Sequence, residues 1–111
     1  MSADYVVVFY GAQVALSAFE VRACESGSHP LMNLARHSRL DTYWADFTSD
    51  DGHSFQLLIG RRFGTFGLDD TLEAQIEKGP VIRAMADVDA FLARVGLPAP
   101  GRLIVRLHQD R

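Results

Sequence analysis

The chain has 111 residues and a net charge of −3, with 48% hydrophobic and 23% charged residues. These values predict a single globular domain over residues 1–111 and exclude a low-complexity or disordered chain. The small negative charge argues against nucleic acid and anionic membranes as partners, because the field of the whole protein would not attract them.

The single cysteine, Cys24, excludes an internal disulfide bond. The first apolar run, Tyr5–Tyr10, is short and lacks the basic flank and the cleavage site of a signal peptide. No other run approaches the roughly 20 apolar residues that span a membrane. We therefore expect a soluble, cytoplasmic protein.

The first predicted strand is Tyr5–Tyr10, and Gly11 is expected to end it. Its continuous β-branched and aromatic residues are typical of a central strand that is buried on both faces. Ser17 and Glu20 then match a capping box, in which the serine hydroxyl and the glutamate carboxylate bind each other's backbone amides. This pattern predicts a helix over residues 18–25.

A second helical segment is predicted from Pro30 to about Ser38, followed by a β-hairpin over Thr42–Gly60. A three-residue hairpin loop over residues 50–52 would place Gly52 at the left-handed position that such loops require. Loops of two or four residues are the alternative.

The loop length decides which hairpin residues share a face. A three-residue loop makes one face wholly apolar and places Trp44 opposite Leu58 on the other face. A loop of two or four residues would return Trp44 to the side of Leu57 and Ile59 and mix both faces. Because a one-residue slip moves every side chain to the opposite face, burial favours the three-residue loop.

The remaining elements are predicted in turn. Gly60–Gly67 is expected to be a loop or a strand end, and Thr71–Glu77 is an edge strand in preference to a helix. A helix then begins at Gly79 and ends at Gly96, with apolar residues at the 3.6 period. The last strand, over residues 102–108, alternates and is expected to bury Leu103, Val105 and Leu107.

This order of elements predicts an α+β domain of the ferredoxin-like plan, β-α-β-β-(β)-α-β, with the helices packed on one face of the sheet. The other sheet face is then open. We expect a binding surface on that open face, formed by Trp44, Asp46, Leu58, Arg106 and His108.

Other candidates for chemistry are weaker. Arg61 and Arg62 lie between glycines and are a possible anion-binding pair. His29 and His37 lack further ligands at metal-binding spacing, so no metal site is expected. Cys24 has no base beside it and is interpreted as a small helix-face residue. We expect no cofactor and identify no catalytic residue.

The function that follows is binding rather than catalysis. A homodimer, or an inhibitor or immunity-type protein that covers a protein partner, would use the open sheet face. The alternative is an enzyme or ligand carrier with a small-molecule cleft on the same face of a ferredoxin-like dimer. In that alternative Asp46, Arg106 and His108 would supply the polar groups.

Overall fold

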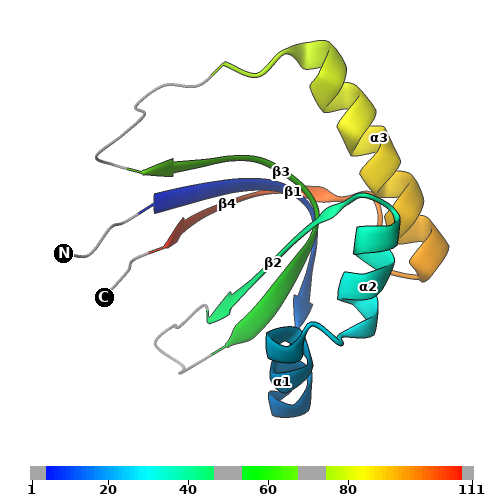
Figure 1. The fold of residues 1–111 in the computed structure, drawn as a ribbon. Coiled ribbons are helices and arrows are strands. Elements are labelled where there is room, and N and C mark those ends of the chain that lie inside the picture. Colours follow the sequence, from blue (N-terminus) through cyan, green and yellow to red (C-terminus); the bar gives the residue numbers. More distant parts are fainter. Residues whose placement is uncertain (1–4, 47–53, 68–74, 109–111) are drawn as a thin grey trace.

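The computed structural model describes residues 5–46, 54–67 and 75–108. Within these residues, four strands form one antiparallel sheet and three helices pack on one side of it (Figure 1). The elements are β1 (Tyr5–Ala15), α1 (Ala18–Ser26), α2 (Pro30–His37), β2 (Asp41–Asp46), β3 (Phe55–Gly67), α3 (Lys78–Val95) and β4 (Arg102–His108). The α+β class is therefore confirmed.

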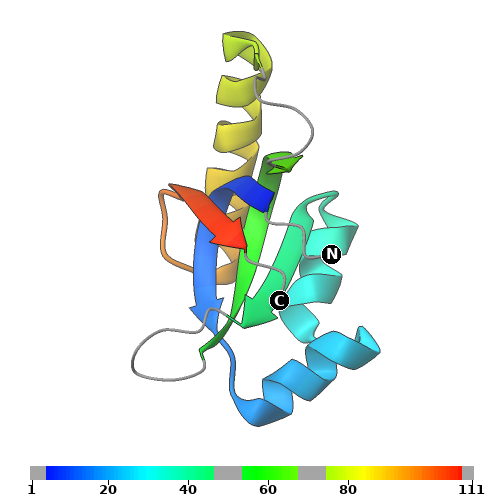
Figure 2. The ribbon, with the colours of Figure 1, turned by 90° about the vertical axis from the view of Figure 1, so that its left-hand side faces the viewer.

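The strand order is β2-β3-β1-β4, so β1 is central, as its continuous apolar run predicts (Figure 2). β1 and β2 both run antiparallel to β3 and lie on either side of it. β3 and β4 flank β1 in the same way. Each helical connection therefore joins two parallel strands that are separated by a third strand.

Two glycines bend the sheet. β1 does not end at Gly11 but continues to Ala15, and β3 continues through Gly60 to Gly67. Gly11 pairs with Gly60, and the backbones are so close that a Cβ on Gly11 would overlap the carbonyl oxygen of Ile59. The strands turn together near this point, with the helices on the outer side of the bend (Figure 1).

The bend gives the sheet two apolar clusters, one on each face. The outer cluster joins strands to helices and contains Tyr10, Ala12, Ala35, Leu57, Ile59, Val88, Phe91 and Leu92. The inner cluster contains only strand residues, and its buried members are Val7, Phe9 and Leu58. Burial on both faces of the strands follows from this curvature.

The hairpin register differs from the prediction by one residue. Trp44 pairs with Leu57 and Tyr43 with Leu58, so the predicted pairing of Trp44 with Leu58 is wrong and Trp44 lies on the helix side of the sheet. The predicted turn itself, over residues 50–52, lies outside the described residues. The argument from burial failed because Leu57 and Leu58 are both fully buried, on opposite faces.

Local signals in the helices are confirmed. Ser17 caps α1 with a complete capping box, and Gly27 and Gly96 end α1 and α3 in the left-handed conformation. The predicted edge strand over 71–77 is not found in its described part, because Gln75–Glu77 is neither helix nor strand. Residues 71–74 lie outside the described residues.

The half-buried carboxylate of Asp89 ties α3 to β1 and to the entry of β4. Asp89 Oδ1 accepts a hydrogen bond from the Tyr10 hydroxyl at 2.8 Å and another from the Gly101 amide at 2.8 Å. Tyr10 lies on β1, and Gly101 directly precedes β4. Asp89 therefore holds α3, the central strand and the entry to β4 in one arrangement.

The glycine crossing predicts a large loss of stability in Gly11→Ala. The added methyl would overlap the Ile59 carbonyl, so the free energy of unfolding should fall by about 2–4 kcal/mol in urea denaturation. Gly79→Ala is the control, because a Cβ there meets only Arg83 Nη1 at 3.6 Å. That variant should match the wild type or exceed it slightly. Equal stability of the two variants would contradict this account of the bend.

The Asp89 contacts predict a second effect, on stability and on its pH dependence. Asp89→Ala leaves the Tyr10 hydroxyl and the Gly101 amide without their acceptor, at a cost of about 1–3 kcal/mol. Burial, and then the hydrogen bond to Asp89, raise the pKa of Tyr10 above its usual value. The stabilisation from Tyr10 is therefore complete below about pH 10 and decreases as the pH rises through the folded-state pKa.

The measurement is urea denaturation from about pH 8 to about pH 11. Tyr10→Phe has no hydroxyl to ionise, so its stability should decline less steeply above pH 10 than that of the wild type. An identical decline in both proteins would contradict the raised pKa.

Candidate functional site

The structure does not gather the predicted site residues on one surface. Trp44 is partly buried on the helix side, packed against the cluster that contains Leu57 and Phe91. Asp46, two residues further along β2, lies on the same side by strand alternation, and its Oδ1 accepts the Ser54 amide at 3.2 Å. The prediction that Trp44 and Asp46 share the open face with Leu58 is therefore wrong.

Leu58 and Arg106 lie on the inner face instead. Leu58 is fully buried beside Val7 and Phe9, so it presents no surface to a partner. Arg106 pairs with Val7, whose side chain belongs to the inner cluster. The sheet therefore separates Arg106 from Asp46, and these two groups do not converge as the small-molecule alternative requires.

His108 ends β4 and pairs with Tyr5 through the backbone. Its side chain lies outside the described residues. The hydroxyl group of Tyr5 lies 3.2 Å from the hydroxyl group of Tyr43. Burial, followed by this hydrogen bond, raises the pKa of Tyr43 far above its usual value, so this phenol stays neutral at physiological pH.

Arg61 and Arg62 belong to different environments. The Arg62 guanidinium carbon lies 5.3 Å from the centroid of the Tyr43 ring, and the Arg62 amide donates to Asp41. Arg61 instead faces a cavity between α2 and α3, with its Nη1 3.8 Å from Asp41 Oδ2. The predicted pair is therefore split: Arg61 lines this cavity, whereas Arg62 lies over the Tyr43 ring.

The largest feature that sequence analysis missed is on β4. Leu103, Val105 and Leu107 were expected to be buried but are 58%, 60% and 56% exposed. They pair with Tyr10, Val8 and Val6 of β1. Paired residues lie on the same face of a sheet, and Tyr10 belongs to the outer cluster, so the three residues lie on the helix side. α3 packs on β1 and β3 but does not cover this stripe. We call these three residues the β4 stripe.

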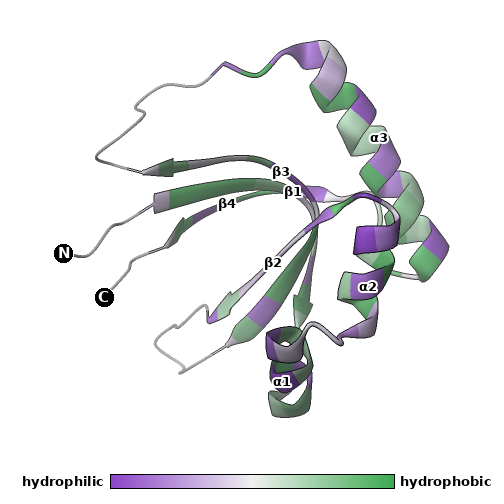
Figure 3. Cartoon of the chain, viewed as in Figure 1, coloured by the Kyte–Doolittle hydropathy of each residue, from purple (hydrophilic) through white to green (hydrophobic). Residues whose placement is uncertain are grey.

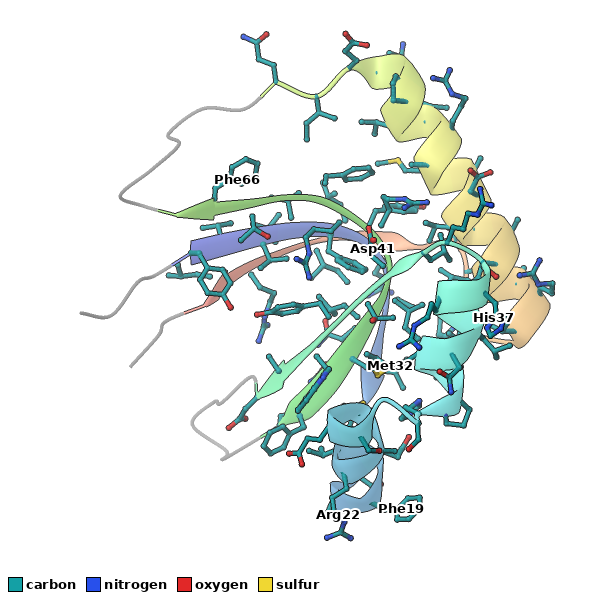
Figure 4. All side chains as sticks on the ribbon, viewed as in Figure 1. Phe19, Arg22, Met32, His37, Asp41 and Phe66 are labelled. Atoms are coloured by element: carbon teal, nitrogen blue, oxygen red, sulfur yellow. The ribbon has the colours of Figure 1, made fainter. Side chains whose placement is uncertain are left out.

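Neighbouring residues extend this apolar surface. Phe66 pairs with Val6 and projects from the outer end of β3 on the side of α3 (Figure 4). Hydrophobic residues cover most of β1 (Figure 3), and in the second half of β3 the hydrophobic residues are Phe63 and Phe66. On α3, Ile82 is 52% exposed. The half of the sheet formed by the start of β1, the end of β3 and β4 therefore has an apolar surface that the helices do not fully cover.

Two cavities lie on other parts of the described surface. One, of about 520 Å³, borders Gly11 and the segment Pro98–Arg102, and its polar side chains are Gln13 and Arg102. The other, of about 590 Å³, is the cavity that Arg61 lines. Neither includes Trp44, Asp46 or Leu58, which were predicted to form a site.

The described residues hold no cluster of three or more His, Cys, Asp or Glu that would bind a metal ion. Cys24 is buried, and burial raises the pKa of its thiol, so it is not a thiolate nucleophile at neutral pH. His29 is also buried, where its Nδ1 accepts the Leu31 amide and its Nε2 lies 3.2 Å from Glu20. His29 and Glu20 therefore connect the start of α2 to α1.

Across the described residues, each helix is too short or too polar to cross a membrane. Comparison of the chain with known protein families, curated proteins and solved structures finds no match.

The new position of Trp44 predicts a structural role. Trp44→Ala removes a partly buried ring from the outer cluster, so it should lower the free energy of unfolding by about 2–4 kcal/mol. Leu103→Ala is the control, because Leu103 is exposed, and it should change stability by less than about 0.5 kcal/mol. Both are measured by urea denaturation at low protein concentration. Unchanged stability of Trp44→Ala would contradict a structural role for Trp44 and favour a role in binding.

Proposed function

We propose that this protein acts by binding protein chains rather than by catalysis, and that its partner is a second copy of itself, bound along β4. The observation that carries this proposal is the β4 stripe on an unpaired edge. In the described sheet β4 pairs only with β1, and its other edge has no strand beside it. An exposed edge with apolar side chains is a template for strand addition.

A second copy fits this edge because the stripe is symmetric. Antiparallel pairing about Val105 sets Val105 against Val105 of the second copy and Leu103 against Leu107. The stripes of both copies then meet on one face. Such pairing would join two sheets into one and bury apolar side chains that are more than half exposed in the single chain.

The charges on β4 are compatible with this register. Arg102 and Arg106 lie on the opposite face from the β4 stripe, by strand alternation. Pairing about Val105 sets Arg106 against Ile104 and Arg102 against His108 of the second copy. No arginine then lies directly opposite another, so like-charge repulsion across the interface is small.

The ferredoxin-like plan and the location also remain proposals. The order of strands and helices, and the two connections that each enclose a third strand, support that plan. A cytoplasmic location is supported by the absence of any second cysteine from the sequence. An inhibitor or immunity-type partner would have to supply an edge strand of its own to β4.

The test is the molar mass in solution, measured by light scattering. The wild type should have twice the 12.3 kDa of one chain. Val105→Asp should be monomeric, because the two-fold axis brings the two introduced carboxylates together in an apolar environment. Phe19→Asp is the control, since Phe19 is 74% exposed on α1, and it should remain dimeric.

A charge pair tests the register itself. Leu103→Glu alone should weaken the dimer, and Leu103→Glu with Leu107→Lys should restore it, because each introduced carboxylate then faces an introduced ammonium of the second copy. A wild type that is monomeric at concentrations on the order of 100 μM would overturn the proposal. So would a Val105→Asp variant that keeps the dimer.

A further inference from the structure

The lining of the cavity between α2 and α3 is rich in positively charged side chains, although the net charge of the protein is −3. Arg39, Arg61 and Arg94 line it, together with His37. The three arginines come from the turn after α2, from β3 and from α3, so the fold brings them together from distant parts of the sequence. One carboxylate, Asp87, is also in the lining.

Arg39 occupies a position that ordinarily belongs to glycine. After α2, the Leu40 amide donates to the Ala35 carbonyl and the Arg39 amide to the Arg36 carbonyl, which is the Schellman pattern. In this motif the residue that follows the C-cap is left-handed, and here that residue is Arg39, with φ 58°. Side chains with a Cβ adopt this conformation at an energetic cost. An arginine here therefore indicates that its side chain has a use that glycine would not provide.

Within the described residues, the Arg39 guanidinium has neither a hydrogen bond nor an ion pair. The other two arginines are held in place. Arg94 Nη2 donates to Ser38 Oγ at 3.0 Å, and its guanidinium carbon is 5.5 Å from the Phe91 ring centroid. Arg61 keeps only a long contact, 3.8 Å, with Asp41. Their charges are thus positioned but not fully compensated.

His37 adds an oriented imidazole at the end of α2 that lies beside α3 (Figure 4). Its Nδ1 is 2.7 Å from the Asn33 carbonyl oxygen. Because a carbonyl only accepts, Nδ1 carries the proton, and Nε2 is left for a ligand. The backbone contact therefore fixes the ring while leaving one nitrogen available.

The geometry points to a binding site for a small phosphate ester in this cavity. Guanidinium groups form paired hydrogen bonds with phosphate oxygens, and three of them match a dianion. Asp87 would accept a hydrogen bond from a hydroxyl group of the ligand, and the Phe91 ring supplies an apolar wall. A volume of about 590 Å³ suits a small molecule. None of the lining residues belongs to β4, so the site does not depend on the proposed dimer.

The experiment is a titration of the full chain with inorganic phosphate and with glycerol 3-phosphate, by calorimetry and by amide NMR shifts. The ester should bind with a dissociation constant on the order of 1 mM or below and tighter than phosphate. Shift changes should centre on residues 36–41 and 87–94. A single-stranded oligonucleotide tests the other source of phosphate. Tighter binding of the oligonucleotide through the same residues would overturn the assignment to a small molecule.

Arg39→Gly separates binding from folding. Glycine suits the left-handed position, so the urea midpoint should stay the same or rise, while affinity for the ester should fall at least about tenfold. Arg94→Gln should weaken binding similarly. Arg22→Gln, on α1 and far from His37 in Figure 4, controls for loss of net charge and should bind like the wild type. Normal binding by Arg39→Gly, or no binding of either probe at about 10 mM, would overturn the inference.

Discussion

The close crossing of Gly11 and Gly60 is the constraint on which the rest of this fold depends. Because neither residue has a Cβ, the central strand and β3 approach closely enough to bend together at one point. The helices cover the sheet on the outer side of this bend. On the inner side the strands pack against one another, which buries Phe9 without any helix. The β4 stripe stays exposed because neither the helices nor the packing of strands on the inner side covers it.

The features that sequence analysis predicted correctly are those decided by a few neighbouring residues. The capping box of Ser17 and Glu20 depends on a spacing of three residues, and α3 ends where Gly96 adopts the left-handed conformation. The central position of β1 follows from its continuous apolar run. Such signals do not require knowledge of how the elements pack.

The prediction of the hairpin register was wrong for a reason that applies to bent sheets in general. The choice of loop assumed one buried face, but Leu57 and Leu58 are both buried, so the pattern of apolar residues held no information about the register. The β4 stripe was misassigned because Leu103, Val105 and Leu107 have the same alternation whether a helix covers them or not. The basic cavity was missed because its residues meet only after α2, β3 and α3 have packed.

The place of β1 in the sheet also bears on how this chain folds during synthesis. β1 leaves the ribosome before both of its neighbours, β3 and β4, which lie later in the sequence. Until they are made, a strongly apolar strand has two unpaired edges. Pairings between distant residues also form slowly. During synthesis the chain therefore passes through a stage in which β1 is complete and both of its partner strands are still missing, and unpaired apolar strands of this kind favour aggregation.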